Sequence, residues 1–217
     1  MIDRLHYISS GKSPEEHLQH IHEACEAGVR WIQLRLKKIT YDEYLFYACE
    51  ARKITKTFDA ILIINDNPRV AELCAADGVH VGIDDTLPED IRKSMNRDII
   101  IGGTANTWQD VLRLIEAEVD YIGLGPFRFT LSKEKLSPIL GLKGYISILE
   151  KMKEVGEKMP VIAIGGIQLE DIAEITRTGV HGIAVSGLIT NASDKSKCVE
   201  QIARQMDYKI SQPLWNH

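Results

Sequence analysis

Short apolar runs alternate with longer amphipathic segments along almost the whole chain. Eight runs have the length and the β-branched content that are typical of buried strands. They cover Leu5–Ser9, Trp31–Leu36, Ile61–Asn65, Gly78–Val81, Ile99–Gly103, Tyr121–Gly125, Val161–Ile164 and Ile183–Val185. Between them, apolar residues recur every three or four positions, as on one face of a helix. These helical patterns include Pro14–Ala27, Tyr41–Thr57, Thr107–Ala117, Gln168–Thr178 and Lys195–Met206.

This alternation predicts the fold class. Strand and helix in strict succession require a parallel sheet, either open and doubly wound or closed into a barrel. Eight repeats favour a single α/β domain with the (β/α)8 TIM-barrel fold, which we expect over residues 1–210, with a tail at 211–217. Gly28, Gly144 and Gly179 are expected at joins between elements.

Composition narrows the class further. The chain has 217 residues, 44% hydrophobic and 26% charged, which predicts a soluble globular domain. A net charge of −5 disfavours broad binding to nucleic acid, and no apolar run approaches the length of a membrane span. The start of the chain lacks a secretory pattern, and the four cysteines are scattered, so we expect a cytoplasmic protein with reduced thiols. The sequence leaves open whether the chain forms a homo-oligomer.

Cations follow the second predicted strand. In a barrel, active-site residues lie at the carboxyl ends of the strands. Alternation places Gln33, Arg35 and Lys37 on one side of the chain. Inward positive charge is costly unless an anion binds to it. A basic edge that reaches solvent is the equally good alternative.

Carboxylates follow the next two strands. Asp66 comes after the third strand, and Asp84 and Asp85 follow the fourth. They could form salt bridges with the nearby cations, or they could bind Mg2+ together with a substrate phosphate. His80 is expected to be a packed strand-end histidine, because no second histidine lies nearby at the spacing of metal ligands.

Glycines and hydroxyls predict a second anion site. Gly165-Gly166 and Ser186-Gly187 follow the seventh and eighth strands, where barrels often bind phosphate through backbone amides. The long irregular stretch 126–142 carries Thr130, Ser132 and Lys133, whose side chains suit a bound anion. Tight turns and an ordinary polar loop are the alternatives.

In this order and spacing, these stretches resemble the thiamine phosphate synthase family along nearly the whole chain. The matching segments are residues 33–37, 65–66, 78–82 with Asp85, 102–104, 120–126, 130–133 and 160–167. The resemblance implies a transferase of thiamine biosynthesis that acts on two small molecules. It would join an aminopyrimidine methyl diphosphate to a thiazole ethyl phosphate, or its carboxylated form, and release pyrophosphate.

The resemblance also implies roles for individual residues. Arg35, Lys37 and Lys133 would be catalytic, and Asp66 and Asp85 would bind Mg2+. The pyrimidine diphosphate would be held by Gln33, Arg35, Lys37, Asn65, Thr104 and Lys133. The thiazole phosphate would be held by Thr130, Ser132, Gly166, Ser186 and Gly187.

Some positions depart from the family pattern. Leu36 and Ile83 stand where the family usually has glutamate and glutamine, and the serine near the eighth strand is shifted to Ser186. Two alternatives therefore stay open. One is a thiazole tautomerase, which shares the barrel but has no diphosphate to neutralise. The other is a barrel that binds thiazole or thiamine phosphate without catalysis.

Overall fold

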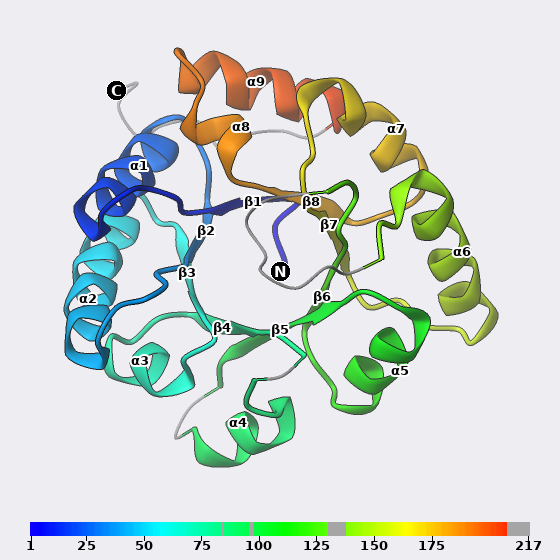
Figure 1. The fold of residues 1–217 in the computed structure, drawn as a ribbon, viewed down its shortest axis with the longest axis horizontal. Coiled ribbons are helices and arrows are strands. Elements are labelled where there is room, and N and C mark those ends of the chain that lie inside the picture. Colours follow the sequence, from blue (N-terminus) through cyan, green and yellow to red (C-terminus); the bar gives the residue numbers. More distant parts are fainter. Residues whose placement is uncertain (84, 96–97, 130–137, 208–217) are drawn as a thin grey trace.

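A closed barrel of eight parallel strands forms the centre of the molecule (Figure 1). This computed structural model describes residues 1–83, 85–95, 98–129 and 138–207. Each strand pairs with the next, and β8 pairs with β1 to close the barrel. The strands are β1 Leu5–Ile8, β2 Trp31–Leu34, β3 Ile61–Asn65, β4 Gly78–Val81, β5 Ile100–Ala105, β6 Tyr121–Leu124, β7 Val161–Ile164 and β8 Gly182–Val185. The predicted (β/α)8 barrel is confirmed; the predicted tail at 211–217 lies outside the described residues.

Helices surround the barrel on the outside (Figure 1). They are α1 Pro14–Glu26, α2 Tyr41–Thr57, α3 Pro68–Leu73, α4 Pro88–Ser94, α5 Trp108–Glu116, α6 Gly141–Glu154, α7 Ile172–Arg177, α8 Gly187–Thr190 and α9 Lys195–Gln205. Side-chain caps fix several starts: Ser13 begins α1, and Thr40 and Thr107 form capping boxes with the third residue of α2 and α5. A 3-10 turn, η1 Leu169–Asp171, precedes α7 within the helix predicted over 168–178.

The predicted join at Gly144 is wrong. Gly144 lies inside α6, which begins at Gly141, a residue with a φ of +54°. The missing side chain of Gly144 instead allows close packing, because an added Cβ would lie 2.8 Å from the Cβ of Leu140. A glycine can therefore mark tight packing within a helix as well as a boundary.

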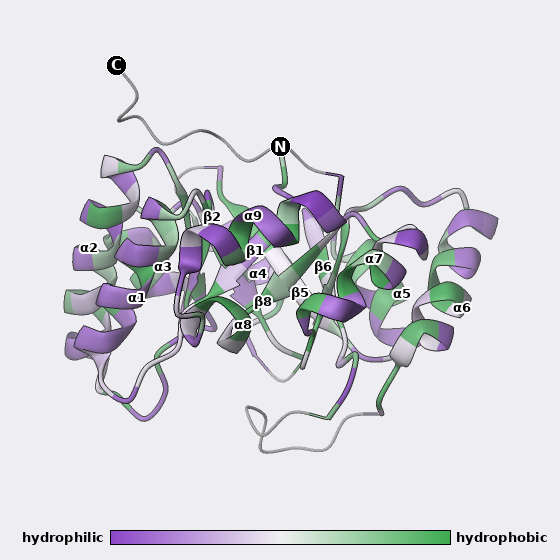
Figure 2. Cartoon of the chain, turned by 90° about the horizontal axis from the view of Figure 1, so that it is seen from above, coloured by the Kyte–Doolittle hydropathy of each residue, from purple (hydrophilic) through white to green (hydrophobic). Residues whose placement is uncertain are grey.

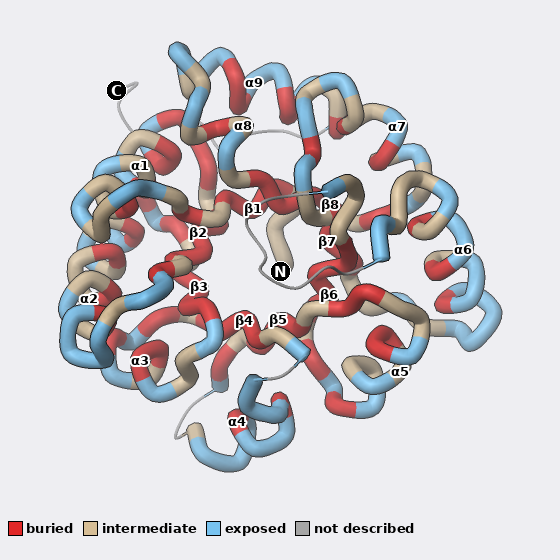
Figure 3. Tube along the Cα trace, in the orientation of Figure 1, coloured by how far each residue is buried: buried red, intermediate tan, exposed pale blue. Residues whose placement is uncertain are grey.

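Apolar side chains form two clusters, one on each side of the strands. The larger cluster lies between the strands and the helices, whose outer faces are exposed and largely hydrophilic (Figures 2 and 3). The smaller cluster fills the barrel interior with Trp31, Ile63, Tyr121, Ile162 and Ala184. His6 stacks on Trp31 with 4.5 Å between ring centroids, and burial lowers the pKa of His6 to about 3. The interior histidine is therefore neutral and packs as an aromatic ring.

The N-terminus lies at the axis of the barrel (Figure 1). Ile2 packs against the interior cluster, and its carbonyl oxygen lies 2.9 Å from Nε2 of His181.

All four cysteines are free thiols. Among the described residues, no helix has the length and apolar character needed to cross a bilayer.

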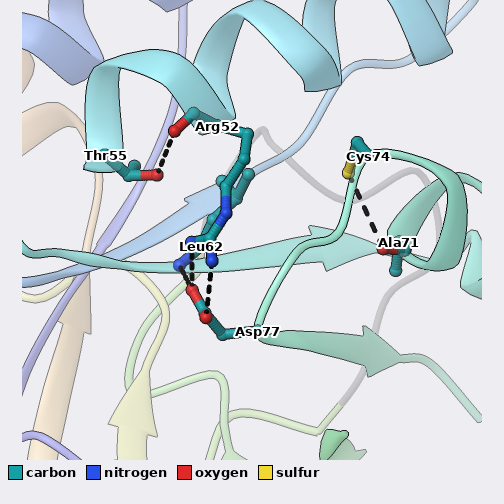
Figure 4. A network of polar contacts seen from close by, with 6 residues as sticks. All are labelled: Arg52, Thr55, Leu62, Ala71, Cys74 and Asp77. Atoms are coloured by element: carbon teal, nitrogen blue, oxygen red, sulfur yellow. Dashed lines mark hydrogen bonds and ion pairs between the residues drawn. The ribbon is translucent and has the colours of Figure 1, made fainter. Parts of the chain in front are cut away.

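A single carboxylate ties α2 to the strands (Figure 4). The Arg52 guanidinium donates to both oxygens of Asp77, at 2.6 and 3.0 Å. Oδ2 of Asp77 also accepts the backbone N–H of Leu62 at 2.8 Å. The side chains of Arg52 and Asp77 are 18% and 25% exposed, so solvent screens this ion pair less than a surface pair. The contact lies where β3 and β4 begin, the end of a barrel that usually serves stability.

Replacing Asp77 with Ala should destabilise the fold. The change leaves the Arg52 guanidinium and the Leu62 N–H without their acceptor, which should cost about 2–4 kcal/mol. The matched control is Glu50→Ala, which breaks an ion pair with the largely exposed Lys53 and should cost less than about 1 kcal/mol. Urea unfolding measures both. Equal losses would contradict the role given to Asp77.

Candidate active site

Two hydrogen-bonded pairs of polar side chains cross the barrel interior near the carboxyl ends of the strands. Nε2 of Gln33 on β2 donates to Oδ1 of Asn65 on β3 at 2.7 Å, and both residues are buried. Nε2 of His80 on β4 lies 3.0 Å from Oγ1 of Thr104 on β5. Four neighbouring strands thus contribute one polar side chain each, forming a polar floor of Gln33, Asn65, His80 and Thr104 above the aromatic residues of the interior.

Asp66 and Asp85 come together beside this floor. Asp66 follows β3 with a φ of +61°, and its N–H donates to the carbonyl of His80 at 2.8 Å. Asp85 is held by the N–H of Gly82, which donates to Oδ2 at 2.7 Å. Burial, the charge of Asp85 and a hydrogen bond with Asp85 raise the pKa of Asp66 to about 6, against the opposing effect of Arg35 and Lys37. The two carboxyl groups are therefore close enough to share a proton.

This pair suits a divalent cation that takes further ligands from a substrate. Mg2+ in phosphate-handling sites usually binds one or two carboxylates, and phosphate oxygens and water complete its shell. Within the described part of the chain, no group of three or more His, Cys, Asp or Glu side chains could hold a metal ion. Among the described residues, the donor set fits a cation that takes its remaining ligands from a phosphate and water.

The two predicted cations lie at different depths. Arg35 is half-buried, and its backbone N–H donates to Oγ of Ser9 at 3.1 Å. This side-chain contact replaces the next strand bond, which explains why β2 ends at Leu34 although the apolar pattern runs to Leu36. Lys37 is exposed, whereas Leu36 packs in the cluster under the helices. Leu36 therefore faces away from the polar floor.

A cavity of about 380 Å3 lies between the ends of β1, β7 and β8. Gly166, Ser186 and Gly187 line it together with Arg35. Gly166 has a φ of +68°, and an added Cβ would lie 2.5 Å from Cγ of Arg128, so a larger residue would not fit. The short helix α8 follows β8 directly, which is where barrels frequently bind a phosphate.

Ser9, Ser10 and Gln168, which were not predicted as site residues, also line this cavity. Ser9 is hydrogen-bonded to Nδ1 of His17 at 2.8 Å, and Ser10 to Oγ1 of Thr190 at 2.9 Å. The signal was present in the sequence, because polar residues follow the first apolar run as they follow the others.

Two further cavities lie at opposite ends of the barrel, and one of them contains predicted site residues. Ile83, Asp85 and Thr104 line a cavity of about 190 Å3, and Ile83 is 42% exposed. A larger cavity of about 740 Å3 lies at the opposite end, where Val161 begins β7 and His181 precedes β8. Catalytic residues of barrels sit at the carboxyl ends of strands, so the larger cavity is not the candidate site. Thr130, Ser132 and Lys133 lie outside the described residues.

Known proteins resemble this chain along nearly its full length. The profile of the family described as thiamine monophosphate synthase matches residues 5–189. A thiamine-phosphate synthase from Flavobacterium johnsoniae is 45% identical over 206 residues, which cover 95% of this chain and 97% of that protein. The solved structure of a thiamine phosphate pyrophosphorylase from Pyrococcus furiosus aligns with a TM-score of 0.82 at 29% identity, covering 94% of this chain and 95% of that one. A 3-hexulose-6-phosphate synthase, at 15% identity and a TM-score of 0.68, shares the fold alone.

Asp66→Asn should stabilise the metal-free protein at neutral pH. The pKa of Asp66 is raised from 3.8 to about 6 in the folded state, so the folded state binds more protons than the unfolded state between these values. Stability is therefore lost as the pH rises through about 6. With solvent screening, the gain from Asp66→Asn should be about 1 kcal/mol at pH 7.5 and near zero at pH 3.5. Urea unfolding in EDTA at both pH values measures it; an equal gain at both would contradict the assignment.

Proposed function

The chain belongs to the thiamine monophosphate synthase family, a family of transferases, and we propose that its site joins two substrates held in adjacent halves. The substrates are 4-amino-2-methyl-5-(diphosphooxymethyl)pyrimidine and a thiazole ethyl phosphate, or its carboxylated form. The products are thiamine phosphate and pyrophosphate. The observation that carries the proposal is the position of Arg35, which lines the 380 Å3 cavity and acts on the charge of Asp66.

The pyrimidine diphosphate occupies the half formed by β2 to β5. Gln33 donates a hydrogen bond from Nε2 to Oδ1 of Asn65. Oε1 of Gln33 can therefore accept from the amino group of the pyrimidine, and the Nδ2 protons of Asn65 can bind its ring nitrogens. Asp66 and Asp85 hold Mg2+, and Arg35 and Lys37 neutralise the diphosphate. When bound, Mg2+ supplies positive charge where negative charge grows on the leaving group. By resemblance, Lys133 joins this half.

The thiazole phosphate occupies the cavity at β1, β7 and β8. Gly166 follows β7, Ser186 and Gly187 follow the neighbouring β8, and all three line the cavity. Backbone amides at such a place suit a phosphate, which carries negative charge and only accepts hydrogen bonds at its ionised oxygens. By resemblance, Thr130 and Ser132 complete this half.

Placing the two substrates side by side supports the bond exchange. The C–O bond between the pyrimidine methylene group and the diphosphate breaks, and both electrons go to the diphosphate. The electron-rich aminopyrimidine stabilises the positive charge left on the methylene carbon. The thiazole nitrogen then gives its lone pair to that carbon, and the protein fixes the approach by holding both phosphate groups. No side chain has to remove a proton in this step.

The comparisons do not favour the two alternatives. The similar curated proteins are named thiamine-phosphate synthases. A tautomerase or a passive binding barrel would have no use for two carboxylates placed together beside Arg35, an arrangement that costs stability. Leu36, one of the departures that raised the second alternative, packs in the apolar cluster under the helices and not on the polar floor. We place the reaction in the cytoplasm, because the four free cysteines suit a reducing compartment.

Incubation with both substrates and Mg2+ tests the proposal. The wild type should release thiamine phosphate and pyrophosphate in equal amounts, and EDTA should abolish the reaction. Asp66→Asn should lower kcat by about 100-fold or more, because it removes charge stabilisation needed mainly in the transition state. Glu50→Ala, on the outside of α2, is the control.

Two results would contradict this account. Absence of thiamine phosphate with folded wild type would overturn the proposed function. Full activity in EDTA would overturn the role of Mg2+ but not the proposed function.

A further inference from the structure

Three side chains inside the barrel form a hydrogen-bonded chain that ends at the candidate site. The hydroxyl of Tyr121 on β6 lies 3.1 Å from Nδ1 of His80 on β4. Nε2 of the same ring lies 3.0 Å from Oγ1 of Thr104 on β5. Tyr121 is 1% and His80 7% exposed, whereas Thr104 is only partly buried. Thr104 is thus the member of the chain nearest to solvent.

Two glycines create the space that this chain occupies. Strand register places Gly102 of β5 between His80 and Tyr121 in one row across the barrel. An added Cβ at Gly102 would overlap the Tyr121 ring, so the absence of a side chain lets the phenol and the imidazole meet. Gly123 pairs with Thr104, and a Cβ there would lie 3.0 Å from Cε1 of His80. The backbone is therefore shaped around this particular contact.

The direction of the hydrogen bonds follows from the Tyr121 hydroxyl. Burial raises the pKa of Tyr121 above its usual range, so the phenol keeps its proton. Among the described residues, Nδ1 of His80 is the only acceptor that this hydroxyl meets. A buried O–H is costly without an acceptor, so Tyr121 donates to Nδ1. A ring that accepts at Nδ1 has its one proton on Nε2, so His80 donates to Oγ1 of Thr104.

We propose that His80 is a positioning residue, held by Tyr121 in the Nε2–H tautomer, which makes the Thr104 hydroxyl a donor toward the pyrimidine diphosphate. Because Oγ1 of Thr104 accepts from His80, its own proton is left for an acceptor on the substrate. In the opposite tautomer, the Thr104 hydroxyl would donate its hydrogen bond to Nε2 of His80. Only the lone pairs of Oγ1 would then face the substrate, which is itself rich in acceptors. The choice of substrate rests on the proposed function; the tautomer does not.

The tautomer can be measured on the ligand-free protein. Long-range 1H–15N correlation spectra of 15N-histidine-labelled protein should show His80 protonated at Nε2 and bare at Nδ1. Tyr121→Phe removes the donor to Nδ1 and should convert this signature into a mixture of tautomers. Tyr145→Phe removes a comparable buried phenol, bonded to the carbonyl of Leu124 at 3.1 Å, and should leave the His80 spectrum unchanged. A His80 ring protonated at Nδ1 in the wild type would overturn the proposal.

A double-mutant cycle tests the effect on Thr104. Thr104→Val and His80→Leu should each raise KM for the pyrimidine diphosphate or lower kcat by about tenfold or more, with KM for the thiazole phosphate unchanged. The double variant should lose no more than Thr104→Val alone, because both changes remove one interaction. His80→Gln, which keeps an N–H near the position of Nε2, should recover part of the loss.

Additive losses in the double variant would overturn the donor role, and so would an equal rise of both KM values. Failure of the proposed function appears differently, as wild type that makes no thiamine phosphate. In that case the His80 spectra still decide the tautomer, and binding of inorganic pyrophosphate to Thr104→Val and His80→Leu replaces the kinetic cycle.

Discussion

The space inside eight parallel strands must be filled, and this packing constraint decides what the catalytic end of the barrel can hold. Trp31, Tyr121 and the stacked ring of His6 fill the interior. The ring of Tyr121 leaves no room for a side chain at Gly102. The polar floor lies above this layer, where substrate and water can satisfy its side chains. The polar floor thus rests on aromatic rings that fix its position.

Electrostatic cost is concentrated at the rim of the same floor. The charge of Asp85 opposes ionisation of Asp66, and burial of Asp66 adds to the cost of its charge. Arg35 and Lys37 offset only part of this cost. At the other end of the barrel, Asp77 has its charge matched by Arg52 and also accepts a backbone N–H. The two ends therefore differ in purpose: charge is neutralised where it supports the fold and left unbalanced where a ligand can complete it.

Much of this arrangement could be predicted from the sequence, because strand ends in a barrel converge on one face. The apolar runs located all eight strands, and the candidate residues at or after the strand ends included Gln33, Asp66 and Gly166. Contacts that depend on the register between strands could not be predicted from the sequence. The Tyr121–His80 hydrogen bond joins residues far apart in sequence and requires the gap at Gly102 between them. The end of β2 at Leu34 was also missed, because the side chain of Ser9, which follows β1, accepts the backbone hydrogen bond that would have continued the strand.

We propose two halves at the mouth of the barrel, which meet at Arg35 and bind their anions at the same time. Calorimetric titration of the thiazole phosphate into protein saturated with Mg2+ and inorganic pyrophosphate measures this directly. The account predicts a ternary complex, with a Kd for the thiazole phosphate within about tenfold of the value without pyrophosphate. Displacement of one anion by the other would show a single shared site and contradict the claim.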